Sequence, residues 1–227
     1  MVRRIFTELL PPRCLVCGSR EPLIKGVCSL CRSQILPIPE PTCDRCGSPC
    51  GTVGVCLQCQ SHPPPFDKMV SAAVFDGLIK DIIHVFKYRK ATVYKKFLAH
   101  LLFDALTPLN LTCDVLTFVP LHWTRMITRG YNQAALIAQE LSGYLETDVR
   151  YDVIRKTRKT ASQVGLKGRD RKRNIHGAFA ARGVDASSVM VVDDVITTGQ
   201  TAYEISRALK NAGASRIVFV SIGRIVS

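Results

Sequence analysis

Two adjacent carboxylates and a hydroxyl-rich loop stand together near the end of the chain. Asp193 and Asp194 follow a short apolar run at residues 189–192. The loop after them contains Thr197, Thr198, Gly199, Gln200 and Thr201. Carboxylates accept hydrogen bonds from vicinal hydroxyls but repel phosphate, whereas the N–H groups at a helix N-terminus attract phosphate. These residues therefore predict a ligand with ribose hydroxyls beside the acids and a 5-phosphate in the loop.

The elements that must position these groups are a buried strand and a helix. The continuous apolar run predicts a parallel strand covered on both faces, and ligands bind at the carboxyl ends of such strands. After the loop, apolar residues spaced by three and four predict a helix that ends at Gly213. A nucleoside-triphosphate phosphate loop is not indicated, because no lysine follows Gly199. An ordinary strand-to-helix turn with an incidental acid pair is the alternative.

This stretch resembles the signature of type I phosphoribosyltransferases, which bind phosphoribosyl diphosphate (PRPP) with Mg²⁺. The resemblance implies that Asp193 and Asp194 are the catalytic acids and hold the ribose, and that residues 197–201 hold the 5-phosphate. It also implies an α/β fold with a mostly parallel sheet flanked by helices. In this family the loop after an earlier strand holds the diphosphate, and arginine suits diphosphate because its N–H donors form a fork.

An apolar strand is predicted at residues 115–120, and the segment that leaves it carries two arginines. The residues assigned to the diphosphate are Pro120, Leu121, His122, Arg125 and Arg129. We expect this segment to form a loop before the amphipathic helix of Ala134, Ile137 and Leu141. For His122 a solvated side chain is the alternative, because a single loop histidine has ordinary uses too.

Other patterns complete the predicted sheet and its helices. Residues 69–75 and 216–223 predict strands. A first helix is predicted with the apolar face Leu78, Ile82, Val85 and Phe86. A second helix is predicted with the apolar face Phe97, Leu101 and Ala105.

Cysteines form a pattern that occurs twice in the N-terminal part of the chain. The first unit contains Cys14, Cys17, Cys28 and Cys31, and the second contains Cys43, Cys46, Cys56 and Cys59. The first pairs are offset by 29 residues and the second pairs by 28. Two Cys-x-x-Cys turns supply four thiolates and close a tetrahedral site, which is typical of structural zinc. The sequence therefore predicts tandem zinc ribbons with two Zn²⁺ ions.

The cysteine pattern leaves two alternatives open. Disulfides are the first, although paired spacing and a reducing cytoplasm both oppose them. Cys50 is the second: it lacks a partner at this spacing, and it is either spare or replaces Cys46. Prolines at residues 63–65 end the cysteine region, so we expect a zinc-ribbon domain at residues 1–62 and a second domain at residues 66–227. No export signal or membrane span is apparent, which predicts a cytoplasmic protein without membrane insertion.

Net charge points to a polyanionic partner or a phosphorylated substrate. The chain carries a formal charge of +13, and basic residues concentrate between Arg150 and His176. This stretch predicts a mobile loop that contacts ligand or nucleic acid, and a solvated charge run is the alternative. The residues assigned to the loop and to DNA are Arg155, Lys156, Gln163, Arg169, Arg171, Lys172 and Arg173.

Taken together, the cysteine units, the arginine segment, the basic stretch and the acid pair resemble the ComF family of competence-related proteins. The resemblance covers nearly the whole chain. It implies a cytoplasmic PRPP-binding protein that handles incoming single-stranded DNA in natural transformation or DNA uptake. It also implies partners such as a DNA-uptake helicase or recombination proteins. One departure follows Tyr88, where the family commonly has a glycine and this chain has Arg89, Lys90 and Ala91.

Two classes of function remain open. In the first, PRPP is a ligand and signal, and the basic surface holds single-stranded DNA, with Phe86, Tyr88, Trp123 and Tyr131 as candidate base-stacking residues. In the second, the chain is an active phosphoribosyltransferase that moves the phosphoribosyl group to a nucleobase or another nitrogen acceptor in nucleotide metabolism. The sequence does not identify an acceptor.

Overall fold

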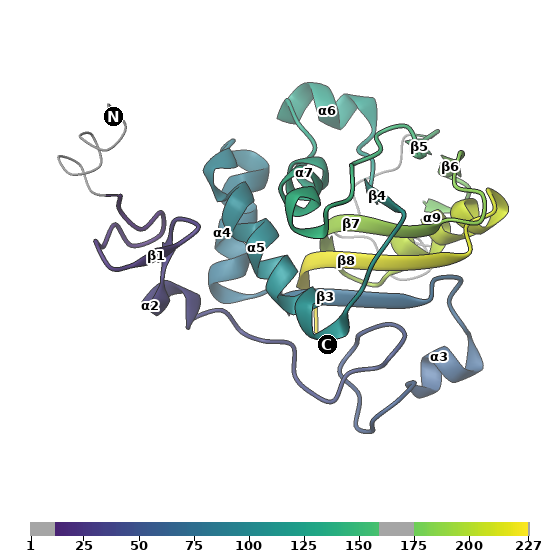
Figure 1. Cartoon of the computed structure of the whole chain (residues 1–227), viewed down its shortest axis with the longest axis horizontal. Helices are drawn as coiled ribbons and strands as arrows, with labels where there is room; N and C mark the ends of the chain where they lie inside the picture. The colour runs from purple at the N-terminus through teal and green to yellow at the C-terminus, as the bar shows by residue number, and fades with distance from the viewer. Residues whose placement is uncertain (1–11, 159–174, 227) are drawn as a thin grey trace.

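A four-stranded parallel sheet forms the centre of the structure, a computed structural model that describes residues 12–158 and 175–226. The strand order is β3–β8–β7–β4. Their bounds are Lys68–Val74 for β3, Val115–Phe118 for β4, Ser188–Ile196 for β7 and Arg216–Arg224 for β8. Parallel strands are buried on both faces, which explains their apolar runs. The predicted α/β fold is therefore confirmed (Figure 1).

Helices cover the two faces of this sheet. One hydrophobic cluster joins the sheet to α4, α5 and α7, and another joins it to α9. The helices span Gly77–Tyr88 (α4), Lys95–Leu106 (α5), Gln133–Leu145 (α7) and Gln200–Asn211 (α9). Short 3-10 turns, Thr92–Tyr94 and Thr107–Leu109, flank α5. Within the described residues, every helix is too short or too polar to cross a bilayer.

Strand β7 runs further than its apolar residues suggest. We expected the acid pair to end the strand, but β7 continues through both acids to Ile196. The reason is its neighbour, because β8 pairs with β7 as far as Ile196 opposite Arg224. The carboxylates therefore stand on a paired strand rather than on a free loop, which limits their movement.

The arginine segment was also predicted incorrectly, since it forms a helix rather than a loop. Helix α6 spans Trp123–Arg129. His122 begins this helix because its side chain accepts a hydrogen bond from the Thr124 N–H. Gly130 ends it in a left-handed conformation with φ 81°, which glycine adopts without steric cost.

The apolar face of α4 differs from the expected one. Its buried residues are Ile79, Ile82, Ile83 and Phe86, whereas Leu78 and Val85 are only half-buried. The helix is therefore turned relative to our prediction. This rotation places Lys80, His84 and Lys87 toward the carboxyl edge of the sheet.

Each zinc ribbon packs on a different part of the second domain (Figure 1). The first contains β1 (Leu23–Ile24), β2 (Val27–Cys28) and α2 (Ser29–Arg32), and the second contains α3 (Leu57–Ser61). The first ribbon meets the helical layer, where the Tyr94 hydroxyl donates to the Leu15 carbonyl at 2.7 Å. The second meets the edge of the sheet, where the Arg224 side chain donates to the Cys46 carbonyl at 2.8 Å.

Candidate functional site

A cavity of about 970 Å³ opens at the carboxyl ends of the parallel strands. Its wall is formed by the ends of β3, β4 and β7, by helices α4, α6, α7 and α9, and by the small antiparallel sheet of β5 (Ile154–Lys156) and β6 (Phe179–Ala181). This volume lies near the upper end of the range for small-molecule sites, roughly 300–1,000 Å³. The cavity can therefore hold a ligand larger than a single phosphate or sugar.

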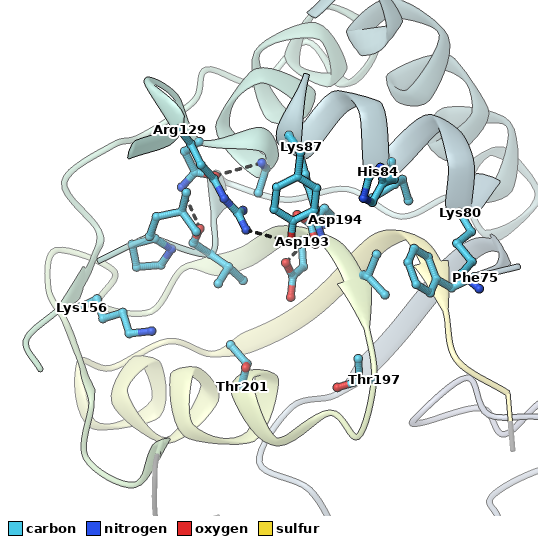
Figure 2. A pocket seen from close by; sticks show the side chains of 18 of the residues that line it. Phe75, Lys80, His84, Lys87, Arg129, Lys156, Asp193, Asp194, Thr197 and Thr201 are labelled. Carbon is cyan, nitrogen blue, oxygen red and sulfur yellow. Dashed lines mark hydrogen bonds and ion pairs between the residues drawn. The ribbon is translucent and has the colours of Figure 1, made fainter. Parts of the chain in front are cut away.

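The acid pair lies in the middle of this cavity (Figure 2). The Asp194 N–H donates to Asp193 Oδ1 at 2.8 Å, and Lys87 Nζ lies 2.7 Å from Asp194 Oδ1. Burial, and then the charge of Asp194, raises the pKa of Asp193 to about 7, and Lys87 opposes this shift. A carboxylate that is buried beside another carboxylate is stabilised by cations and by hydrogen-bond donors. The pair is therefore suited to accept hydrogen bonds from a hydroxyl-rich ligand.

The phosphate loop lies beside the acids. Thr197 and Thr201 line the cavity, and Gly199 and Gln200 line a smaller hollow that also contains Asp193. Gly199, with φ 71°, precedes the first residue of α9, so the free N–H groups of this helix begin at the predicted position. Thr198 is exposed and lines neither space.

The diphosphate residues divide into two groups. Pro120, Leu121 and Arg129 line the cavity. Arg129 donates to Gln133 Oε1 at 3.2 Å, and its guanidinium lies 5.1 Å from the centre of the Tyr88 ring. His122 instead begins α6 and does not line the cavity in the described part of the chain. The Arg125 side chain lies outside the described residues.

The basic stretch reaches the cavity through β5. Lys156 lines the cavity, with its ammonium 5.4 Å from the centre of the Phe179 ring, whereas Arg155 on the same strand is exposed. Figure 2 shows Lys156 and Arg129 on one side of the acid pair. The other residues assigned to this loop, Gln163, Arg169, Arg171, Lys172 and Arg173, lie outside the described residues.

The opposite side of the cavity was not predicted from the sequence. Figure 2 shows Phe75, Lys80 and His84 on that side, and Lys87 lies above the acids. The signal was present, because Lys80, His84 and Lys87 follow each other at four and three residues, the spacing of one helix face. A polar helix face more often meets solvent than ligand, so this spacing alone did not identify a site.

Lys90, which also lines the cavity, stands in the segment that departs from the family pattern. Its φ is 54°, a left-handed value that glycine adopts more easily than lysine. The turn after α4 therefore has a backbone conformation that glycine favours, although the residue there is a lysine.

The two cysteine units form two separate sulfur clusters. Each cluster has four Sγ atoms within 4.8 Å of one another, with the membership predicted from the spacing. The Sγ–Sγ distance is 3.9 Å between Cys14 and Cys31, and 3.8 Å between Cys46 and Cys56. A tetrahedral ion with Zn–S bonds of about 2.3 Å separates its sulfurs by about 3.8 Å. The clusters therefore fit two structural zinc sites.

Cys50 belongs to neither cluster. Its thiol donates to the Thr52 carbonyl at 3.1 Å, and Cys46 occupies the fourth position of the second cluster. The interpretation of Cys50 as spare therefore agrees with the structure. Cys113 is half-buried, and burial raises the pKa of its thiol to about 11.

Both the N-terminal and the C-terminal part of the chain match known protein families. Residues 5–60 match the double zinc ribbon domain, and residues 128–223 match the phosphoribosyl transferase domain. The chain is 32% identical over 223 residues to Competence protein F of Haemophilus influenzae, covering 93% of this chain and 96% of that protein. It is also 32% identical over 218 residues to DNA utilization protein YhgH of Escherichia coli K12, covering 92% and 95% of the two chains.

Solved structures match part of the chain. A structure of the allosteric regulatory enzyme of purine biosynthesis is 22% identical, covers 56% of this chain and 25% of its own, and gives a TM-score of 0.37. The identity and coverage of Competence protein F and YhgH extend over both domains. This chain, with its double zinc ribbon and phosphoribosyl transferase domain, therefore belongs to the ComF family.

Proposed function

We propose that this chain binds PRPP with Mg²⁺ at the acid pair and uses this ligand in handling incoming single-stranded DNA. The observation that carries the proposal is one cavity that joins the acids Asp193 and Asp194 to a phosphate loop and to the cations Arg129 and Lys156. Ribose, phosphate and diphosphate each need one of these three kinds of group. PRPP contains a ribose, a phosphate and a diphosphate.

Each group then has a defined role in binding. Asp193 and Asp194 accept hydrogen bonds from the ribose hydroxyls, and the N–H groups at the N-terminus of α9 hold the 5-phosphate. Arg129 and Lys156 attract the diphosphate. The donor set also fits Mg²⁺, because carboxylates and phosphate oxygens are its preferred ligands, and the ion would neutralise diphosphate charge.

The DNA part of the proposal rests on the relatives and on the surface. The relatives are named for competence and DNA utilization, and the net charge of this chain is +13. Of the four aromatic candidates, Trp123 is 65% exposed and Tyr88 is 59% exposed, although the Arg129 guanidinium lies over the Tyr88 ring. Phe86 is buried, and the Tyr131 ring packs against it. Trp123 and Tyr88 are therefore the stacking residues we propose.

The protein also has a proposed cellular location, two proposed domains and proposed protein partners. We propose a cytoplasmic protein, because reduced cysteines are available for zinc there. Residues 1–62 would form the zinc-binding domain and residues 66–227 the ligand-binding domain. DNA-uptake helicases or recombination proteins are the proposed protein partners.

An active phosphoribosyltransferase is the second candidate. The observation that favours it is the extension of the cavity beyond the acids to Phe75, Lys80 and His84, which offers room for an acceptor. In that reaction a nitrogen nucleophile forms a bond to C1 of PRPP while the bond from C1 to diphosphate breaks. The acid pair would stabilise positive charge that develops on the ribose.

Calorimetry tests the binding proposal. Asp193→Asn with Asp194→Asn should abolish Mg²⁺-dependent PRPP binding. The matched control is Asp81→Asn with Asp148→Asn, which changes the charge equally at two exposed residues outside the cavity. Equal affinity of the acid-pair variant and the parent, with both folded by circular dichroism, contradicts the site. Release of diphosphate upon addition of bases, nucleotides or single-stranded DNA would favour the enzyme.

A further inference from the structure

A buried cation joins the second zinc ribbon to the sheet. The Arg224 side chain is 6% exposed and donates to the Cys46 carbonyl at 2.8 Å and to the Ser48 hydroxyl. Its Nη1 also lies 3.3 Å from the Met69 sulfur. No carboxylate among the described residues pairs with this guanidinium. Because a buried charge without a partner is costly, the compensating charge must come from another group.

The second cysteine cluster supplies that charge when it holds zinc. Four thiolates and one Zn²⁺ carry a net charge of about −2. Cys46 is one of the four ligands, and its carbonyl accepts the hydrogen bond from Arg224. The guanidinium is therefore placed as the counter-charge of the zinc site.

The backbone of Arg224 belongs to the framework of the ligand cavity. Arg224 pairs with Ile196 of β7, and its carbonyl accepts from the Phe75 N–H at 2.7 Å. The next residue, Ile225, donates its N–H to the Ile196 carbonyl at 3.0 Å. Phe75 and Ile225 line the cavity. Movement of this strand end would therefore move two walls of the cavity and the start of the phosphate loop.

Met69 provides a second connection between the second zinc ribbon and the ligand cavity. A Cβ added to Gly47, in the turn after Cys46, would collide with the Met69 carbonyl oxygen. The other end of the methionine reaches the phosphate loop, because a Cβ added to Gly199 would lie 3.8 Å from Met69 Cε. The cysteine turn, Met69 and the phosphate loop are thus in close contact.

We infer that the second zinc site is a structural part of the ligand cavity and that Arg224, a positioning residue, couples its metal content to PRPP affinity. This inference rests on the proposed function. The first ribbon differs, because Tyr94, Asp104 and Tyr144, which contact it in the described part of the chain, do not line the cavity. Linkage requires the coupling to act in both directions, so PRPP should also retain zinc in the second site.

The duplicated turns provide a matched pair of variants. Gly18 and Gly47 follow the second cysteine of each unit, with φ of 75° and 63°. Alanine strains both backbones, but it finds open space at residue 18 and collides with Met69 at residue 47. Gly47→Ala should lower PRPP affinity about tenfold, a typical coupling, whereas Gly18→Ala should change it less than about twofold. Calorimetry and zinc analysis are made on both proteins.

Arg224 variants test the charge directly, including the case in which Gly47→Ala does not fold. Arg224→Met removes the counter-charge. Arg224→Lys keeps the positive charge but lacks the several N–H donors of the guanidinium. Release of zinc to a chromogenic chelator should occur in two phases, one for each site. One of these phases should be faster in Arg224→Met than in the parent, and its rate in Arg224→Lys should lie between the two. PRPP should slow that phase in the parent but not in Arg224→Met.

The outcomes separate this inference from the proposed function. A parent protein that does not bind PRPP contradicts the proposed function and the coupling together. A parent that binds PRPP, with Gly47→Ala and Arg224→Met binding it equally well, overturns the coupling alone. Equal losses in the Gly18→Ala and Gly47→Ala proteins also overturn it, because the effect would then be general destabilisation.

Discussion

Lys87 Nζ lies 2.7 Å from Asp194 Oδ1, so helix α4 is tied by an ion pair to the acid pair at the end of β7. The two side chains are only 18% and 16% exposed. The contribution of this ion pair to stability should therefore be intermediate. Exposed ion pairs contribute little to stability, whereas disrupting a fully buried ion pair is strongly destabilising.

Lys87→Met should lower the free energy of unfolding at pH 8 by about 2 kcal/mol, because it leaves Asp194 half-buried without its cation. Urea unfolding measures this change. The control is Lys80→Met on the same helix, since Lys80 has no ion-pair partner among the described residues. Equal losses in the two variants would show that the ion pair contributes nothing specific.

The ligand-free protein should lose stability as pH rises toward neutrality because of Asp193. Its pKa is raised from 3.8 to about 7 in the folded state, so between these values the folded protein binds more protons than the unfolded one. Stability from this group therefore falls as pH rises through this window and is constant above it. Asp193→Asn lacks this dependence and should exceed the parent by about 1–3 kcal/mol at pH 8.

Urea unfolding of both proteins from pH 5.5 to 8.5 provides the measurement. The zinc sites are the same in both, so their own pH dependence cancels in the difference. Asp148→Asn, at an exposed position, is the control and should follow the parent. A constant difference between Asp193→Asn and the parent across this range would contradict the raised pKa.

Purified, reduced protein should contain two zinc ions per chain. Cys17→Ser should retain one, because each cluster closes independently, and Cys50→Ser should retain two, because Cys50 lies outside both clusters. Elemental analysis checks these counts. Strong chelators should unfold the ribbons, since small domains with little core depend on their metal. Quantitative disulfides or the absence of zinc would exclude this assignment.

Single-stranded DNA should bind with little sequence preference and with strong dependence on salt. Each phosphate contact contributes a slope of about −0.7 in log affinity against log salt. Replacing Arg169, Arg171, Lys172 and Arg173 by alanine should therefore flatten the slope by up to about three units. Fluorescence anisotropy across a salt series measures it. An unchanged slope would move the DNA surface elsewhere, for example to the zinc ribbons.

Trp123 offers a separate test of base stacking. Trp123→Ala should weaken single-stranded DNA binding by about 1–3 kcal/mol without changing the salt slope, and Trp123→Phe should retain most of the affinity. Titration at one salt concentration measures the affinity, and the salt series measures the slope. Equal affinity of Trp123→Ala and the parent would remove α6 from the proposed DNA surface.

The sequence predicted features that depend on local chemistry. Cysteine spacing alone identified the membership of both clusters, and a single apolar run located β7 beside Asp193. Both signals are strong because neighbouring residues act on the same ion or the same strand. The extension of β7 to Ile196 was not predictable in this way, since it depends on pairing with β8.

Features that depend on distant partners were missed. The polar face of α4 has the same pattern whether it meets solvent or a cavity, so Lys87 gave no sign of its contact with Asp194. Arg224 is separated by 178 residues from Cys46, and nothing in either local sequence indicates their contact. Packing between distant segments decides these cases.

The position of β3 beside β8 has a consequence for folding during synthesis. Ser71 and Ser221 share a hydrogen bond across 150 residues of chain, so the sheet edge next to the second ribbon stays open until the last strand is made. The four sulfurs of each cysteine cluster come from one short stretch of chain, so the ribbons can fold around zinc much earlier. Nascent chains should therefore carry folded ribbons beside an unpaired strand, a state in which chaperone binding or aggregation competes with completion.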